Sequence, residues 1–362
     1  MRVRENLWLG LALLLASACS KGSPEKRVDS PTPGAEAHFA LVGGTVVGIG
    51  SADVTIHGAE IEAVGTAEPG IERVDVNGRF LVPAFIDSHV HLAYYSVAAE
   101  LVSRGVIAAV DLAAPIETLG VPSAPLTLLP SGPMLTAVGG YPVTSWGAGG
   151  YGLEIATPDE GEAAVDRLFE AGAAVIKMPF TGEPTLDDAT AKAVADRAHA
   201  HGLKVFAHAL GAADAARAAT AGVDVFAHTP TETLDATTVA TFASRAVVST
   251  LATFGGAQSL ANFGALRAAG ATVLYGTDLG NSRDAGIQLA EIEQLLQAGL
   301  DGAAILEAGT RAPARYFGLG ELGEIAVGKR ACLLVLEQDP LADPRTLARP
   351  LIVYVDGQRQ GG

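Results

Sequence analysis

The sequence predicts an α/β fold: a (β/α)8 TIM barrel joined to a small β-sandwich domain that both chain ends build. Three observations lead to this prediction. Apolar runs typical of buried parallel strands alternate with alanine-rich helical segments through the middle of the chain. Short alternating segments with Gly and Asn-Gly turns stand at both ends, as β-hairpins require. Polar, metal-competent side chains close several of the apolar runs, where the functional residues of such a barrel lie.

Composition limits the partners that the protein can have. The chain has 362 residues, a hydrophobic fraction of 49% and a formal net charge of −16. The apolar fraction is ample for a core, and the strong acidic balance argues against nucleic-acid and anionic-membrane partners on electrostatic grounds. We therefore expect a globular protein that has neither nucleic acid nor an anionic membrane surface as its partner. The sequence does not indicate an oligomeric state.

The N-terminal segment has the pattern of an export signal. Arg2 and Arg4 precede the apolar stretch "LWLGLALLLASA", which is too short to span a bilayer. We predict a signal peptide over residues 1–18, a lipidated Cys19, and a flexible Ser- and Pro-rich tether over residues 19–37. Contact with a membrane is then expected only through this lipid anchor, in a bacterial cell-envelope lipoprotein on the periplasmic or surface side. Ala-Ser-Ala before the cysteine also fits ordinary signal cleavage, which leaves a soluble secreted or periplasmic protein as the alternative.

The two chain ends are predicted to form one domain around a central insertion. Segments such as "FALVGGTVVGIG" and "ADVTIHGAEIEAVG" near the N-terminus have counterparts in "LGEIAVGKRACLLVLEQDPL" and "PLIVYVDGQRQ" near the C-terminus. Residues 38–80 with 320–360 are assigned to the small β-sandwich domain, and residues 81–319 to the barrel.

Eight apolar runs supply the expected barrel strands. They are "FLVPAFIDSHVH", "GVIAAVDLA", "PLTLLPSGPMLT", "AAVIKMPF", "LKVFAHAL", "VDVFAHTP", "AVVSTLAT" and "TVLYGTDL", and the third is the least regular. Helical segments separate most of them. One helix is expected to begin after Thr157 as N-cap, with Pro158 in its first turn, and to stop at Gly172.

The ends of the runs carry the candidate chemistry. The first run closes with His89 and His91, whose side chains point to the same side because strand side chains alternate with period two. Later runs close with four further groups: Lys177, His208, His228 and Asp278. A single histidine of this kind is more often structural, Lys177 alone could pack its stem, and Asp278 alone could cap a helix. Barrel closure would bring all six to one mouth, and this joint placement predicts a metal site.

These residues stand in motifs that resemble a known family. "GRFLVPAFIDSHVHL", "GAAVIKM", "AHAHGLKVFAHALGAADAARAATAGVDVFAH", "YGTDLG" and "LGEIAVGKRACLLVLEQDPLADP" are similar to stretches of the amidohydrolase superfamily, in its imidazolonepropionase-like and Xaa-Pro dipeptidase-like branch. The resemblance covers roughly residues 38 to 360. It implies a binuclear metal centre, in which His89 and His91 bind one divalent ion with Asp278, while His208 and His228 bind the second.

The resemblance further implies that carbon dioxide carboxylates Lys177, so that its carbamate bridges the ions, and that Asp278 is the catalytic proton acceptor and donor. Zinc suits the nitrogen and oxygen ligands, and manganese and iron(II) are alternatives. Asp87 shares a strand face with His89. It either holds a metal ligand in place from behind, without touching the ion, or is a strand-end hydrogen-bond partner. Tyr141 stands where relatives often have a histidine after Gly-Gly, which makes it a candidate substrate contact. Other residues after strand ends could also line the pocket or only pack there: Tyr94, Tyr95, Trp146, Tyr151 and Arg283.

The expected function is metal-dependent hydrolysis of an amide C–N bond in a dipeptide, an N-acyl amino acid or a cyclic amide. A second hypothesis is a mononuclear deaminase or cyclic-amide hydrolase, which would not need Lys177 as a bridge. A third is a surface lipoprotein that binds a ligand without catalysis, which would not need Asp278 beside a water. The number of bound ions discriminates the three.

Overall fold

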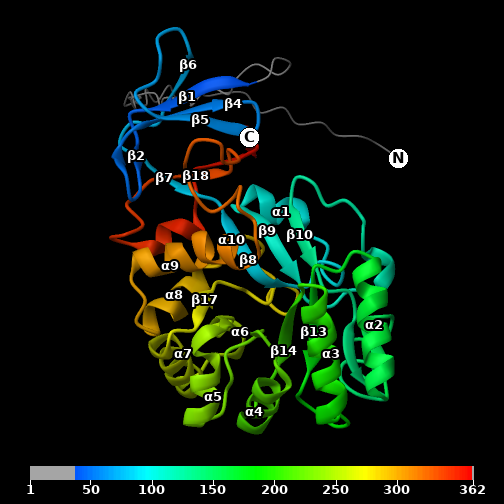
Figure 1. The fold of residues 1–362 in the computed structure, drawn as a ribbon. Coiled ribbons are helices and arrows are strands. Elements are labelled where there is room, and N and C mark those ends of the chain that lie inside the picture. Colours follow the sequence, from blue (N-terminus) through cyan, green and yellow to red (C-terminus); the bar gives the residue numbers. More distant parts are fainter. Residues whose placement is uncertain (1–36, 361–362) are drawn as a thin grey trace, which may run out of the picture.

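The computed structural model describes residues 37–360 (Figure 1). The predicted signal peptide, Cys19 and all but the last residue of the predicted tether lie outside the described residues. In the part of the chain that is described, no helix has both the length and the apolar character needed to cross a bilayer.

Strands from both chain ends lie together at one end of the molecule, the blue and red part of Figure 1. A four-stranded sheet has the order β5-β4-β1-β6 and a six-stranded sheet the order β20-β19-β18-β7-β2-β3. The first sheet consists of β1 (His38–Val42), β4 (Asp53–His57), β5 (Glu60–Gly65) and β6 (Glu72–Asp75). The second consists of β2 (Thr45–Val46), β3 (Gly50–Ser51), β7 (Phe80–Pro83), β18 (Leu333–Leu336), β19 (Ile352–Val355) and β20 (Gln358–Gln360).

One apolar cluster joins these two sheets. Phe39 and Ile56 of the first sheet lie in the same buried cluster as Leu333 and Tyr354 of the second, and the rings of Phe39 and Tyr354 are 5.6 Å apart. The predicted use of both chain ends in one sheet agrees with the pairing of β7 with β18. The exact domain boundaries stay a prediction.

The middle of the chain forms parallel strands. One sheet has the order β10-β9-β8 and another the order β13-β14-β15-β16-β17. Their bounds are β8 (Phe85–Val90), β9 (Val106–Asp111), β10 (Thr127–Pro130), β13 (Val175–Pro179), β14 (Lys204–His208), β15 (Val225–Phe226), β16 (Ala246–Val248) and β17 (Thr272–Leu274). Backbone hydrogen bonds link the two sheets at both sides: Ser88 N–H donates to Tyr275 O over 2.9 Å, and Ala174 N–H donates to Pro130 O over 2.8 Å.

A cluster of inward-facing side chains spans both parallel sheets. Val110 of β9 and Leu129 of β10 belong to it together with Val175, Phe206 and Leu274 from the five-stranded sheet. An α/β fold with parallel strands is therefore confirmed. Closure into a single (β/α)8 barrel stays a prediction that these links support.

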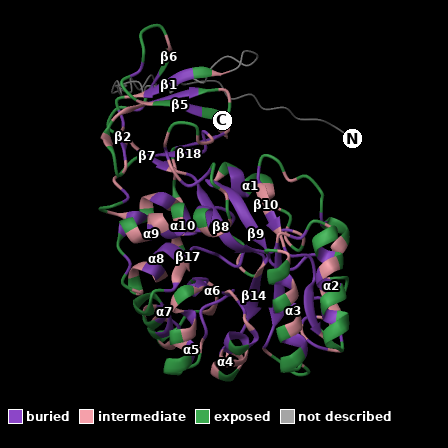
Figure 2. Ribbon diagram, viewed as in Figure 1, coloured by how far each residue is buried: buried purple, intermediate pink, exposed green. Residues whose placement is uncertain are grey.

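Helices cover the outside of the parallel strands, with buried inner faces and exposed outer faces in Figure 2. They are α1 (Ala98–Ser103), α2 (Pro158–Glu170), α3 (Asp188–Ala200), α4 (Ala212–Ala221), α5 (Ala236–Thr241), α6 (Leu251–Phe254), α7 (Ala257–Ala269), α8 (Leu289–Gln297), α9 (Gly302–Gly309) and α10 (Arg311–Tyr316). Short 3-10 turns are η1 (Ile116–Thr118), η2 (Phe242–Ser244) and η3 (Pro344–Ala348). The predicted start of α2 is confirmed, because Thr157 Oγ1 accepts the N–H of Glu160 over 3.3 Å.

The third apolar run is not one strand, contrary to the sequence prediction. It divides into β10 and β11 (Met134–Ala137), and β11 pairs in parallel with β12 (Gly152–Ile155) instead of extending β10. The break lies at Pro130-Ser-Gly-Pro, where proline lacks a backbone donor and Gly132 has a φ of +69°. The chain thereby gains a long connection, residues 138–151, next to the candidate site.

Candidate metal centre

The ends of β8 and β17 bring two histidines and an aspartate into contact. His89 Nε2 lies 3.3 Å from His91 Nε2. Asp278 Oδ1 lies 3.0 Å from His91 Nε2 and 3.4 Å from His89 Nε2. All three side chains are buried. The prediction that the side chains of His89 and His91 point to the same side is therefore confirmed.

The spacing of these three atoms suits a tetrahedral metal ion. Ligands about 2.0–2.1 Å from zinc in a tetrahedron lie roughly 3.3 Å from one another, which is close to the separations seen here. Two buried atoms of these residues, His91 Nδ1 and Asp278 Oδ1, have no hydrogen-bond partner within residues 37–360. Asp278 Oδ1 is thus a buried carboxylate oxygen that lies among imidazoles and receives no hydrogen bond from the described residues. A bound cation would satisfy it.

His228 and His208 extend the cluster. A ligand atom from each of His89, His228 and Asp278 can be chosen so that all lie within 4.8 Å of one another. The ring of His228 is 4.4 Å from that of His89 and 4.8 Å from that of His208. Burial, reinforced by the charges of Lys177 and His91, lowers the pKa of His208 to about 3. Burial likewise holds the pKa of His89 and of His228 well below 6.5, so these imidazoles are neutral, as metal binding requires.

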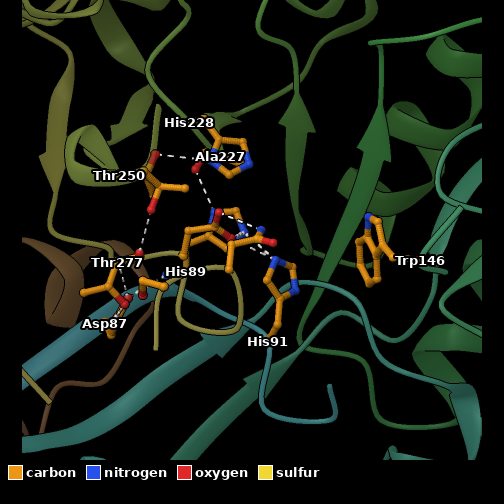
Figure 3. A network of polar contacts seen from close by, with 12 residues as sticks. Asp87, His89, His91, Trp146, Ala227, His228, Thr250 and Thr277 are labelled. Carbon is orange, nitrogen blue, oxygen red and sulfur yellow. Dashed lines mark hydrogen bonds and ion pairs between the residues drawn. The ribbon is translucent and has the colours of Figure 1, made fainter. Parts of the chain in front are cut away.

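Two contacts behind the imidazoles fix their orientation (Figure 3). His89 Nδ1 lies 2.8 Å from the carbonyl oxygen of Ala227. A carbonyl can only accept, so Nδ1 carries the proton and Nε2 of the neutral ring presents its lone pair to the cluster. His228 Nδ1 contacts Thr250 Oγ1 over 3.1 Å, which directs its Nε2 the other way. The sequence analysis did not identify either contact.

Asp87 and the turn at Asp278 lock β8 to the end of β17. Asp87 accepts hydrogen bonds from the N–H of His89 (3.0 Å) and from the N–H and hydroxyl of Thr277 (3.1 and 2.6 Å). Its role is therefore that of a strand-end hydrogen-bond partner, not a direct support of an imidazole. Asp278 has a φ of +53°, donates its N–H to His89 O over 2.9 Å, and accepts from Asn281 Nδ2 over 2.9 Å. A non-glycine residue held in this conformation is typical of a functional turn.

Lys177 lies in the middle of β13 and is completely buried. No hydrogen-bond partner of its Nζ is found in the described part of the chain. Burial lowers its pKa to about 7, while the charge of Asp278 acts in the opposite direction. The charge of Lys177 in turn lowers the pKa values of His89, His208 and His228, so Lys177 lies near this cluster. The structure thus brings the six predicted ligands near one another, with Lys177 placed within β13 and not at its end.

The loop after β11 builds an aromatic wall beside the histidines. Tyr141 stacks on His208 with ring centroids 5.1 Å apart, and its hydroxyl accepts a hydrogen bond from Trp146 Nε1 over 2.8 Å. The Trp146 ring lies 5.6 Å from that of His91. Further candidates from the sequence join this wall, with Tyr94 and Tyr151 near Trp146, and Arg283 over the rings of Tyr94 and Tyr95.

A buried glutamate behind Thr250 was missed by the sequence analysis, because nothing near it in the chain marks it as different from a surface helix residue. Glu291 of α8 accepts the N–H groups of Leu251 (3.0 Å) and Ala252 (2.7 Å), at the start of α6. α6 in turn places Phe254 with its ring 4.5 Å from that of His228. Glu291 therefore acts as a positioning residue for the elements around His228.

The pKa of Glu291 gives a pH-dependent prediction. Burial raises this pKa from 4.5 to about 7, against the opposing effect of Ser249 and of the two N–H groups. The folded protein thus retains a proton that the unfolded chain has released, and the resulting stability is present below about pH 4.5 and lost as the pH rises to about 7. The free energy of unfolding of the unaltered protein should therefore fall between pH 5 and pH 8 by about 2–3 kcal/mol more than that of Glu291→Gln, which has no carboxyl group to ionise. Urea unfolding of the chelator-treated proteins measures it.

The control for this prediction is Glu293→Gln on the same helix, whose carboxylate is exposed and paired with Arg345. Its stability should follow that of the unaltered protein at both pH values. Parallel pH dependences for Glu291→Gln and the unaltered protein would contradict the assigned pKa.

The fold and the site together define an α/β protein with a buried group of histidines and a carboxylate that can hold a metal ion. The Amidohydrolase family model matches residues 80–359, and the chain belongs to this family. The predicted kinship is thereby confirmed, and the protein is classed with the hydrolases of that family.

Solved structures share the fold over most of the chain. A Xaa-Pro dipeptidase with bound methionine in its active site is 19% identical with a TM-score of 0.77, over 90% of this chain and 100% of that one. A prolidase complexed with N-methylphosphonate-L-proline is 22% identical with a TM-score of 0.73, over 89% and 99%. Ochratoxinase from A. niger is 17% identical with a TM-score of 0.71, over 90% and 96%. These likenesses establish the fold. Comparison with curated protein sequences gives no match.

Proposed function

We propose that the protein is a metal-dependent amidohydrolase that cleaves an amide C–N bond of a small substrate. The observation that carries this proposal is the convergence of His89, His91 and Asp278, with ligand atoms 3.0–3.4 Å apart, beside the buried amine of Lys177. The donors fit a divalent ion, because neutral imidazoles and a carboxylate oxygen suit zinc, with manganese and iron(II) as alternatives.

Two ions are expected. His89, His91 and Asp278 would hold one, and His208 and His228 the other. When bound, such ions supply Lewis acidity, which polarises the scissile carbonyl and acidifies the attacking water. The hydrogen bonds behind His89 and His228 orient the imidazoles for this role.

Lys177 is proposed to bridge the ions as a carbamate. An ammonium group has no lone pair for a metal, whereas a carbamate has two anionic oxygens. The neutral amine attacks the carbon of carbon dioxide, so that a C–N bond forms, one C=O π bond becomes a C–O⁻ group, and the nitrogen loses one proton. Support comes from the pKa of about 7, which leaves much of the amine unprotonated at neutral pH, and from the absence of a polar partner for Nζ in residues 37–360.

Asp278 is proposed to move the proton. Its Oδ1 faces the histidines while Asn281 holds its Oδ2, so one oxygen is fixed and the other is directed at the reacting centre. Asp278 takes a proton from the attacking water and returns it to the leaving nitrogen as the C–N bond breaks.

Dipeptides of the Xaa-Pro type are the first substrates to consider, followed by N-acyl amino acids and cyclic amides. The prolidase and the Xaa-Pro dipeptidase among the structural neighbours support this order. Tyr141, stacked on His208, is the proposed substrate contact from the protein. The pattern of residues 1–37 supports export, with Cys19 as a lipid anchor in a cell-envelope lipoprotein, or a soluble periplasmic or secreted form as the alternative.

Metal analysis together with a substrate screen tests the proposal. The purified full-length protein should contain two divalent ions per chain, and a library of dipeptides, N-acyl amino acids and cyclic amides should reveal hydrolysis with added zinc or manganese. One ion per chain would favour a mononuclear deaminase or cyclic-amide hydrolase. A protein without bound metal and without turnover would instead favour a ligand-binding lipoprotein and overturn the proposal.

A further inference from the structure

A cavity lies beside the strand end that carries His91. Its volume is about 420 Å³, and Leu92 and Ala93, the two residues after His91, form part of its wall. The start of α1, the loop after η1 and strand β10 complete the lining, which is apolar over most of its surface. This volume is within the range of cavities that hold small ligands.

A buried carboxylate forms part of this lining. Asp111 is the last residue of β9 and is 3% exposed. Its Oδ1 has no partner at full hydrogen-bond geometry within residues 37–360. The imidazole of His91 and the N–H groups of Ala93 and Leu92 also act electrostatically on this carboxylate. An ionised carboxylate held in apolar surroundings is costly unless a cation or donor meets it.

The hydroxyl groups in the same lining donate their protons to backbone carbonyl oxygens. Ser96 donates to Leu92 O over 3.2 Å, Thr118 to Pro115 O over 2.7 Å, and Ser123 to Leu126 O over 2.8 Å. Each of these hydroxyls therefore has only acceptor lone pairs left for a ligand. The lining contains no lysine, arginine or histidine.

We propose that this cavity binds a small organic ammonium ion, whose N–H groups donate to Asp111 and whose hydrocarbon body packs against the apolar wall. A cavity that presents an anionic oxygen and only acceptors selects a cation rich in donors and disfavours carboxylates and neutral acceptors. The cavity wall includes none of the six candidate metal ligands. Occupation by a free amine does not depend on the proposed hydrolysis, whereas occupation by the amino group of a substrate rests on it.

Two sources can supply the ammonium group: a free amine, or the amino group of a substrate bound at the metal centre. Titration calorimetry with cyclohexylammonium chloride tests the first source. Chelator-treated full-length protein is used, so that the amine has no metal to coordinate. Binding should weaken roughly tenfold or more in Asp111→Asn, whereas cyclohexanol, the neutral isostere, should bind weakly to both proteins.

Two further variants keep the test decisive. Ala98→Leu fills the cavity without changing Asp111 and should abolish binding of the ammonium ion. Asp284→Asn removes the same charge from an exposed residue paired with Arg104 and should leave binding unchanged. Equal affinity for cyclohexylammonium in the unaltered protein, Asp111→Asn and Ala98→Leu would overturn the proposal, as would equal affinity for the alcohol and the ammonium ion.

The second source is tested by turnover. If the substrate's amino group is the occupant, Asp111→Asn should raise KM for dipeptides with a free amino group and leave KM for their N-acetylated forms unchanged. If a free amine is the occupant, both KM values should stay the same while cyclohexylammonium binding is still lost. Failure of the hydrolase proposal would leave the calorimetric result intact, so the two proposals can be rejected separately.

Discussion

Replacing Lys177 with alanine is expected to leave the protein with at most one bound ion and to lower turnover on the order of a thousandfold, the loss typical when a main electrostatic contribution is removed. The physical reason is that Lys177 is the only proposed ligand able to provide two anionic oxygens, in its carboxylated form. The amine is fully buried and lies close enough to His89, His208 and His228 to lower their pKa values. Metal content by mass spectrometry and steady-state kinetics measure the two effects.

Chemical rescue distinguishes a bridge from a packing role. Acetate or propionate can enter the space left in Lys177→Ala and supply a carboxylate, so part of the activity should return. Lys177→Met fills the same space without a charge, and these carboxylates should not rescue it. Lys192→Met, at an exposed lysine paired with Asp196, is the matched control and should behave like the unaltered protein. Full activity in Lys177→Ala would show that the bridging assignment is wrong.

The second large effect is expected for Asp278→Asn, with kcat lowered by about 10²–10⁴-fold, which is the range for loss of a general acid–base group. Asparagine keeps an oxygen near His91 and can retain the contact with Asn281, but it cannot accept a proton from water. The turn should stay folded because asparagine tolerates the positive φ of this position. The measurement is kcat and KM at fixed metal content.

A change in KM alone would contradict this role, because loss of a proton carrier should reduce kcat and leave substrate binding nearly intact. Asp284→Asn is the control in the same loop, since its carboxylate is exposed and pairs with Arg104 outside the ligand set. Its kinetics should match those of the unaltered protein.

Much of the site could be predicted because each ligand closes an apolar run. His89, Lys177, His208 and the others interrupt or end strands that are otherwise buried, and parallel strands bring their carboxyl ends to one edge. A polar residue in such a run is visible in the sequence itself. The cap of α2 at Thr157 could be predicted for a similar reason, since it depends on residues adjacent in the chain.

The supports of the site could not be predicted in this way. The carbonyl of Ala227 behind His89 has no side-chain signature. Thr250 and Glu291 are ordinary residues whose role arises only when α6 and α8 pack together. Asp111 looks like one more strand-end acid until the cavity beside it is formed. The division of the third apolar run also depended on context, because β11 finds its partner in β12, well along the chain.

The sequence alone determined which residues are candidates for the chemistry and in what order they occur, because hydrophobic periodicity and strand-end placement are local properties of the chain. The tertiary structure alone decided the 3.0–3.4 Å spacing of His89, His91 and Asp278 and the hydrogen bonds that orient the imidazoles. It also decided the burial of Lys177 Nζ and Asp111 Oδ1, for which no hydrogen-bond partner is found in the described chain. These features depend on distances between segments far apart in sequence, and only the packing of the strands and helices sets those distances.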